Sequence, residues 1–253
     1  MIDYDLELRH HNDVLRIAYA IRASDRVVDV GCGTGQTTRD AARLATAGTV
    51  LGIDRSAEMI ERARALTSAA HIGNVEYVCA NAEEQELPRE RFDVAISRFG
   101  TMFFSRPVAA FAQLRSALRA QGRLVMMVWQ SRDRNEWATS IERALASDEA
   151  SASAEPQAFS LGATDVAERI LDSAGFLAPR FEEVRAPVFY GRDVDAAFEF
   201  VSEFSTVRER IAGLDSGPRA HAVDRLRDLL ARHQAADGVW FDSRAWIVTA
   251  HRE

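Results

Sequence analysis

Three glycines at alternate positions, Gly31, Gly33 and Gly35, directly follow a short apolar run at residues 27–30. Glycine lacks a Cβ and tolerates positive φ, so it recurs where a chain turns sharply and its backbone contacts a ligand. A helical pattern over residues 37–44 comes next, and the N–H groups and dipole of a helix N-terminus favour an anionic ligand group. The stretch therefore predicts a strand, a glycine turn and a helix that bind such a group. A plain tight turn is the alternative.

The spacing of these glycines separates the known classes of nucleotide-binding turn. The dinucleotide pattern needs its third glycine at the position of Gln36, and a P-loop needs Gly-Lys-Ser or Gly-Lys-Thr, which the sequence lacks. The next apolar run, residues 49–54, ends in Asp54. This acid lies near the offset of about 20 residues at which α/β folds bind both ribose hydroxyls. Asp54 is therefore a candidate ribose ligand; its alternative role is to cap the helix that begins after Ser56.

Alternating apolar runs and helical patterns must position these residues. The predicted strands are residues 27–30, 49–54, 75–80, 92–97, 123–129, 181–190 and 240–250. Helices are predicted at residues 108–118, ended by Gln121-Gly122, and at residues 164–174, ended by Gly175. Strands that alternate with helices predict an α/β fold with a doubly wound, seven-stranded and mostly parallel sheet. Ligands of such sheets bind at the carboxyl ends of the strands.

Four ordered motifs carry a resemblance to a known family. They are residues 29–35, residues 54–59, residues 81–83 with Leu87-Pro88, and residues 91–93. Over residues 20–130 the chain resembles the class I S-adenosylmethionine (SAM) dependent methyltransferases, in the small-molecule branch that includes the ubiquinone and menaquinone biosynthesis enzymes. The resemblance implies a Rossmann-like methyltransferase fold, SAM as the cofactor and S-adenosylhomocysteine as a product.

The resemblance also implies roles for individual residues. The backbone of Gly31 and Gly33 would contact the methionine part of SAM, Asp54 the ribose and Met59 the adenine. The side chain at position 81 and the backbone of Ala82 would read the adenine edge. The family usually has aspartate at position 81; asparagine keeps an acceptor oxygen but adds two donors and removes a charge.

Ser97 and Arg98 would border the methionine part and the route to the methyl group. The full set of expected cofactor-binding residues is Asp29, Gly31, Cys32, Gly33, Gly35, Asp54, Arg55, Met59, Asn81, Ala82, Glu83, Ser97 and Arg98. Two of them have other interpretations: Met59 as ordinary helix core, and Arg98 as part of a structural salt bridge.

Aromatic residues are the candidates for binding the methyl acceptor. Trp129 and Trp137 bracket a polar loop that follows the fifth strand, and Phe200 and Phe204 lie in a helical insertion at residues 192–238, between the last two strands. This insertion resembles the lid of small-molecule methyltransferases, although core packing explains these aromatic residues as well.

Residues 1–23 predict an N-terminal helical cap that closes over the cofactor. His10 and His11 precede its apolar positions, and either is a candidate for taking the acceptor's proton or for a simple helix cap. No residue is assigned as the catalytic base, and no metal cluster is expected.

Composition limits the function further. The 253 residues carry a net charge of −7, and the 31 basic residues form no dense block, so nucleic acid is not the expected substrate. One methyltransferase domain over residues 1–253 is predicted, with residues 146–158 as its mobile segment. Cys32 and Cys79 fit small core residues in a reducing compartment. The acidic start has no signal-peptide pattern and no run is long enough to span a membrane, which predicts a cytoplasmic protein.

The favoured hypothesis is transfer of the SAM methyl group to a small-molecule acceptor by in-line displacement. A SAM-binding regulatory module without catalysis is the alternative from another class. A nicotinamide-dependent oxidoreductase is the alternative among enzymes, and Gln36 disfavours it. The sequence specifies neither the acceptor, nor the atom that is methylated, nor the oligomeric state.

Overall fold

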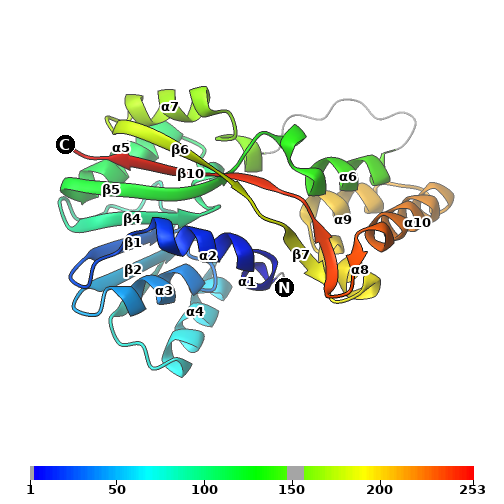
Figure 1. Ribbon diagram of the computed structural model, residues 1–253, viewed down its shortest axis with the longest axis horizontal. Coiled ribbons are helices and arrows are strands. Elements are labelled where there is room, and N and C mark those ends of the chain that lie inside the picture. The colour runs from blue at the N-terminus through cyan, green and yellow to red at the C-terminus, as the bar shows by residue number, and fades with distance from the viewer. Residues whose placement is uncertain (1–2, 147–156) are drawn as a thin grey trace. The chain divides into compact units, whose positions relative to one another are not determined.

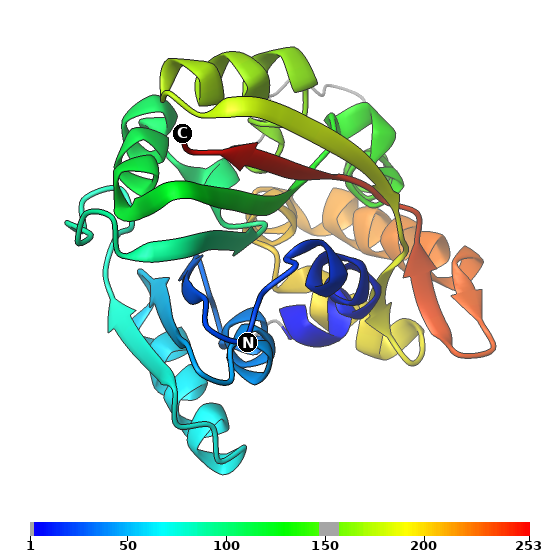
Figure 2. The same ribbon diagram turned by 60° about the vertical axis from the view of Figure 1, so that its left-hand side comes forward.

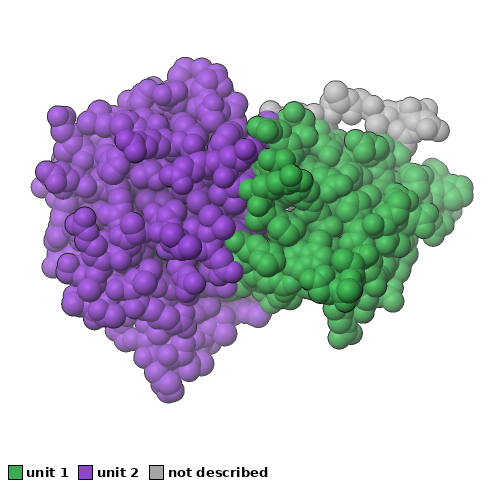
Figure 3. All heavy atoms as spheres, viewed as in Figure 1, with its two compact units in different colours: residues 1–10, 132–155, 185–244 green, residues 11–131, 156–184, 245–253 purple. Residues whose placement is uncertain are grey.

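The computed structural model describes residues 3–146 and 157–253, and the chain divides into two compact units (Figure 3). The sheet unit comprises residues 11–131, 156–184 and 245–253. The insert unit comprises residues 1–10, 132–155 and 185–244. The predicted mobile segment lies largely at residues 147–156, outside the described residues.

A seven-stranded sheet, in the order β3-β2-β1-β4-β5-β10-β6, organises the sheet unit (Figure 1). The strands are β1 Arg26–Val30, β2 Thr49–Asp54, β3 Val75–Cys79, β4 Phe92–Arg98, β5 Leu118–Trp129, β6 Leu177–Arg185 and β10 Arg244–His251. Strands β1 to β5 pair in parallel and β10 is antiparallel to β5. Because β1 lies between β2 and β4, the chain reverses its direction of travel there, which places the binding crevice at the carboxyl end of β1.

Helices cover both faces of this sheet. They are α2 Arg9–Ala18, α3 Gln36–Leu44, α4 Ala57–Ala69, α5 Pro107–Ala117 and α7 Thr164–Ser173. Right-handed crossovers put α3 and α4 on one face and α5 on the other, because the strand order reverses at β1 (Figures 1 and 2). The predicted doubly wound, mostly parallel α/β fold is confirmed.

The insert unit combines helices with a small sheet of order β7-β9-β8. Its helices are α1 Tyr4–Glu7, α6 Glu136–Leu145, α8 Val194–Ser202, α9 Ser205–Ala212 and α10 Ser216–Arg232, and its strands are β7 Val188–Gly191, β8 Gln234–Ala235 and β9 Gly238–Phe241. The predicted helical insertion at residues 192–238 contains three helices, because the chain leaves helical geometry at Phe204 (φ −62°, ψ 128°), between α8 and α9. Its role as a lid stays a prediction.

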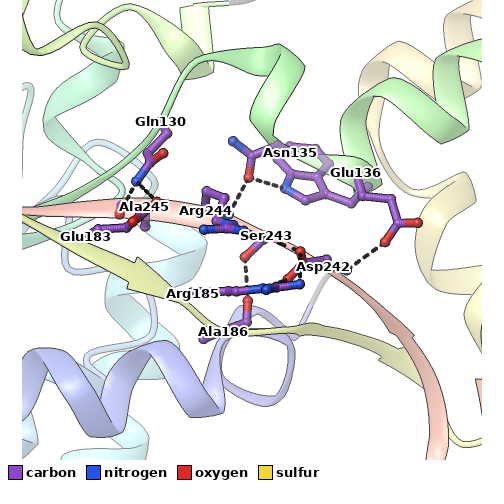
Figure 4. Close-up of polar contacts among 11 residues, drawn as sticks. Gln130, Asn135, Glu136, Glu183, Arg185, Ala186, Asp242, Ser243, Arg244 and Ala245 are labelled. Atoms are coloured by element: carbon purple, nitrogen blue, oxygen red, sulfur yellow. Dashed lines mark hydrogen bonds and ion pairs between the residues drawn. The ribbon is translucent and has the colours of Figure 1, made fainter.

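Two predicted strands, residues 181–190 and 240–250, are each broken in the middle. The first breaks at Ala186 and Pro187, where proline removes a backbone donor; the second breaks at Asp242 and Ser243. The two breaks are bonded together, because Ser243 Oγ donates to the Ala186 carbonyl at 2.7 Å. Arg185 also pairs with Asp242 at 3.0 Å (Figure 4). Side-chain contacts therefore replace the ladder of hydrogen bonds at this point.

Side chains from the start of α6 occupy the same place (Figure 4). Glu136 Oε2 accepts from the backbone N–H of Asp242, and Asn135 Oδ1 accepts from that of Arg244, both at 3.0 Å. In a continuous strand, the N–H groups of Asp242 and Arg244 could bond to a neighbouring strand. Here they donate to the side chains of Glu136 and Asn135 at the start of α6.

Two further predictions need correction. The helix predicted at residues 108–118 ends at Ala117, within one residue of its expected end, but Gln121-Gly122 does not cap it, because β5 begins at Leu118, before the expected start at Arg123. In the predicted N-terminal cap, apolar residues recur at helical spacing from Val14 onward, yet Ile17 is 79% exposed and Val14 41% exposed. The residues that α2 buries are His11, Asn12 and Leu15.

Candidate cofactor and acceptor sites

The glycine turn connects β1 to α3 with all three glycines at positive φ, 70° at Gly31, 53° at Gly33 and 78° at Gly35. A Cβ on Gly31 would lie 2.9 Å from Gly100 Cα, so only glycine fits. A Cβ on Gly33 would meet no atom within 4 Å among the described residues. The turn therefore has an open side at Gly33, where a ligand can approach the backbone.

Asp54 supports this turn from the end of β2. Its Oδ2 accepts from the Gly33 backbone N–H and its Oδ1 from that of Ser56, both at 2.9 Å. Ser56 itself caps α4, because its Oγ accepts from the Met59 N–H at 3.3 Å. An ionised carboxylate has about four lone-pair sites, so the contacts of Asp54 are compatible with binding ribose hydroxyls as well.

Asp29 lies beneath the turn and is fully buried. Its Oδ2 accepts from the hydroxyls of Thr37 and Thr38, each at 2.6 Å, which ties β1 to the first turn of α3. Its Oδ1 has no hydrogen-bond partner among the described residues. Burial raises the pKa of Asp29 to about 6, although the two threonine hydroxyls and Arg98 oppose the rise.

Ser97 and Arg98 end β4 beside the same turn. The buried Ser97 Oγ donates to the Val30 carbonyl at 2.8 Å. Arg98 Nη1 donates to Asn12 Oδ1 at 3.2 Å and to Gln36 Oε1. Hydrogen bonds to two amide side chains thus orient the guanidinium, and its contact with the cofactor stays a prediction.

The residues expected at the adenine have contacts of their own. Asn81 Oδ1 accepts from the Glu83 backbone N–H at 3.1 Å, so it stabilises its own turn. The Glu83 carboxylate accepts from Ser105 Oγ at 2.8 Å and from the Arg106 N–H at 2.7 Å, at the start of α5. Although burial opposes the change, these hydrogen bonds lower the pKa of Glu83. Met59 and Ala82 are half-buried.

Cys32 belongs to the core, although it lies in the turn. It packs with Ile60, Ala63 and Tyr77, and burial raises the pKa of its thiol. The Tyr77 ring fills the space beside two glycines, since a Cβ on Gly52 would lie 2.7 Å from the ring and one on Gly35 would overlap the phenol oxygen. Arg55 is exposed.

Aromatic rings gather at the carboxyl ends of β4 and β5. Trp129 stacks on Phe99 with ring centroids 3.9 Å apart, and the His11 ring stands edge-on to both, at 5.3 and 5.7 Å. Phe99 has a positive φ of 57°, which is rare for a bulky residue and typical of functional sites. In the sequence, Phe99 stands out only because Gly100 follows it directly after the fourth strand. Its stacking on Trp129 was not predicted.

In the insert unit, Phe200 and Phe204 come together on Tyr190. The Phe200 ring stacks on Tyr190 at 5.5 Å and the Phe204 ring meets it edge-on at 5.8 Å. Trp137 belongs to the same unit, and its Nε1 donates to Asn135 Oδ1 at 3.2 Å. His10 contacts Trp240 at 5.3 Å, so the two adjacent histidines belong to different units.

The sheet order, the glycine turn and the acid at the end of β2 together define a Rossmann-like fold with an adenosyl-cofactor site. Comparison with known proteins specifies the class. A methyltransferase domain family matches residues 27–122. An uncharacterized methyltransferase of Schizosaccharomyces pombe is 30% identical, over 92% of this chain and 88% of its own length. The chain therefore belongs to the class I SAM-dependent methyltransferases, and its cofactor is SAM.

Two further similarities agree with this assignment. The ubiquinone/menaquinone biosynthesis C-methyltransferase UbiE of Proteus mirabilis is 33% identical over 44% of this chain. The match covers 45% of the UbiE sequence, just under half. The crystal structure of YcgJ from Bacillus subtilis superposes with a TM-score of 0.67 at 16% identity, covering 97% of this chain and 99% of that one, which shows a shared fold.

The described residues, 3–146 and 157–253, lack two kinds of feature. No helix there is long and apolar enough to cross a bilayer. The same residues hold no group of three histidine, cysteine, aspartate or glutamate side chains arranged for a metal ion.

Proposed function

We propose that this methyltransferase transfers the SAM methyl group to a small-molecule acceptor by in-line displacement and releases S-adenosylhomocysteine. The observation that carries the proposal is the aromatic wall of Phe99, Trp129 and His11 at the carboxyl ends of β4 and β5. Such a surface suits a flat or apolar acceptor and excludes water from the reacting atoms. The similarity to UbiE, a C-methyltransferase of ubiquinone and menaquinone biosynthesis, also supports a small-molecule acceptor.

The residues of the chain bind and orient the reactants. SAM supplies the reactive methyl group when bound. The backbone at Gly31 and Gly33 would hold the methionine part, and Asp54, fixed by its two backbone contacts, would hold the ribose. Orientation and exclusion of water are the main demands of such a transfer. A base is needed only for an acceptor such as a phenol, so none is assigned.

All of the expected ligand contacts stay predictions. The residues expected at the cofactor are Asp29, Gly31, Cys32, Gly33, Gly35, Asp54, Arg55, Met59, Asn81, Ala82, Glu83, Ser97 and Arg98. The residues expected at the acceptor are Trp129, Trp137, Phe200 and Phe204. The single-domain organisation, the N-terminal cap, the absence of nucleic-acid binding and the cytoplasmic location are likewise predictions.

Calorimetric titration with SAM, S-adenosylhomocysteine and NADH tests the cofactor site in the wild type and in Asp54→Ala. Both adenosyl compounds should bind the wild type, and the variant should bind them about tenfold or more weakly, since it loses the hydrogen bonds that a charged carboxylate accepts. Exposed Asp13→Ala, on α2, is the matched control and should bind normally. Binding of NADH alone would favour an oxidoreductase.

Release of S-adenosylhomocysteine tests turnover against phenols, quinols, amines and a short oligonucleotide. Turnover with one of the small acceptors is the expected result. Tight SAM binding without turnover on any acceptor would favour a regulatory module, and turnover on the oligonucleotide alone would contradict a small-molecule acceptor.

A further inference from the structure

Helix α2 packs on the sheet unit through two polar side chains, His11 and Asn12, and the apolar Leu15. His11 is fully buried and Asn12 is 5% exposed, whereas Val14 and Ile17 on the same helix face solvent. A helix that only packs on a core buries an apolar stripe instead. The burial of consecutive polar residues points to a role at the site beside them.

Asn12 is bonded on both sides of its amide. Its Nδ2 donates to Asp40 Oδ2 at 2.9 Å, on α3, and its Oδ1 accepts from Arg98 Nη1 at 3.2 Å. Because both amide atoms are used, the side chain cannot flip without losing both contacts. Asn12 therefore holds the Arg98 guanidinium in one orientation.

Gln36 is the second support of Arg98. It occupies the position where a dinucleotide-binding turn would have its third glycine, and its Oε1 accepts from the same Nη1. A guanidinium carries five N–H donors in one plane, so two contacts through Nη1 fix that plane beside the start of α3. Gln36, which departs from the dinucleotide pattern, thus helps to orient Arg98.

The glycine turn has acidic side chains beside it, and Arg98 supplies a positive charge next to them. Asp29 and Asp54 are both acidic, and Arg98 is close enough to Asp29 to lower its pKa. The methionine part of SAM carries an ammonium group and a carboxylate. Acids alone would attract the ammonium group and repel the carboxylate, whereas arginine binds a carboxylate through two parallel N–H groups.

We propose that Arg98 binds the methionine carboxylate of SAM and that Asn12 and Gln36 are positioning residues that orient Arg98 for it. Helix α2 is then part of the cofactor site. The proposal rests on the assignment of SAM as the cofactor and adds a recognition role for three side chains.

Decarboxylated SAM separates this role from a structural one, because it differs from SAM only by the missing carboxylate. Affinities for SAM and decarboxylated SAM are measured by calorimetry on the wild type, Arg98→Gln and Asn12→Ala. The wild type should prefer SAM. Arg98→Gln should bind SAM about tenfold or more weakly with its affinity for decarboxylated SAM unchanged, and Asn12→Ala should show a smaller loss of the same kind.

Arg43→Gln is the matched control, because Arg43 donates to the other oxygen of Asp40 at 2.9 Å without contacting Arg98. Arg43→Gln should keep the wild-type preference for SAM over decarboxylated SAM. Arg98→Lys should recover part of the preference that Arg98→Gln loses. An equal loss of affinity for both compounds in Arg98→Gln, with an unchanged melting temperature, would overturn the proposal. Failure of the wild type to bind either compound would overturn the cofactor site itself, and this proposal with it.

Discussion

Replacing the buried Asp29 by asparagine should change how stability depends on pH. The substitution preserves shape, and the oxygen of the new amide can accept the two threonine hydroxyls that Asp29 Oδ2 accepts now. What it removes is the charge. Because burial raises the pKa of Asp29 to about 6, the carboxyl group of Asp29 binds its proton more tightly in the folded protein than in the unfolded chain.

The sign and size of the effect follow by linkage. The stabilisation from this proton is fully present below the unfolded pKa of 3.8 and is lost as the pH rises through about 6. At 1.36 kcal/mol per pKa unit, the ionised group costs about 3 kcal/mol at pH 8. About 2 kcal/mol of this loss of stability occurs between pH 4.5 and pH 8.

Urea unfolding of the wild type and Asp29→Asn at pH 4.5, 6 and 8 measures the effect. The variant should gain stability relative to the wild type as the pH rises, and most of the gain should fall between pH 4.5 and pH 6, because the stability changes mainly between the unfolded and folded pKa values of Asp29. Glu83→Gln is a control of opposite sign, because the pKa of Glu83 is lowered and its stabilisation is lost as the pH falls. A difference between Asp29→Asn and the wild type that stays constant with pH would refute this reasoning.

Two other substitutions test the backbone at the turn and at the strand breaks. Gly31→Ala should lower the free energy of unfolding by about 2 kcal/mol, because alanine is strained at a φ of 70° and its Cβ meets Gly100; SAM binding by the refolded variant should be lost. Ser243→Ala should cost about 1 kcal/mol by removing the buried bond to Ala186, with SAM affinity unchanged. Urea unfolding and calorimetry check both, and a fully stable Gly31→Ala would contradict the first.

Local patterns predicted the parts of the fold that neighbouring residues determine. Strand β2 has the predicted bounds, and α3 begins one residue before the predicted start. Asp54 was predicted at the turn because its spacing from the glycines is a property of the motif. Its bonds to Gly33 and Ser56 are compatible with the ribose role and show why an acid is needed there even without ligand.

Contacts between distant residues set the features that the sequence did not predict. The breaks at Ala186 and Ser243 depend on a bond between residues 57 positions apart, and Glu136 reaches Asp242 over 106 positions. The bond from Arg98 to Asn12 spans 86 positions. No periodicity within a short window of sequence carries such information, so the burial of His11 and Asn12 on α2 was not predicted.

The packing of Tyr77 links the sequence variation of two positions. Its ring occupies the space where a side chain on Gly52 would lie. During divergence, Gly52 can become alanine only after position 77 has lost its large ring, whereas the ring can shrink first at the cost of a cavity. Gly35 contacts the same ring but stays glycine in either case, because its φ of 78° strains any residue with a Cβ. Among homologues, glycine at position 52 should therefore accompany an aromatic residue at position 77, and a residue with a Cβ at position 52 should accompany a small one.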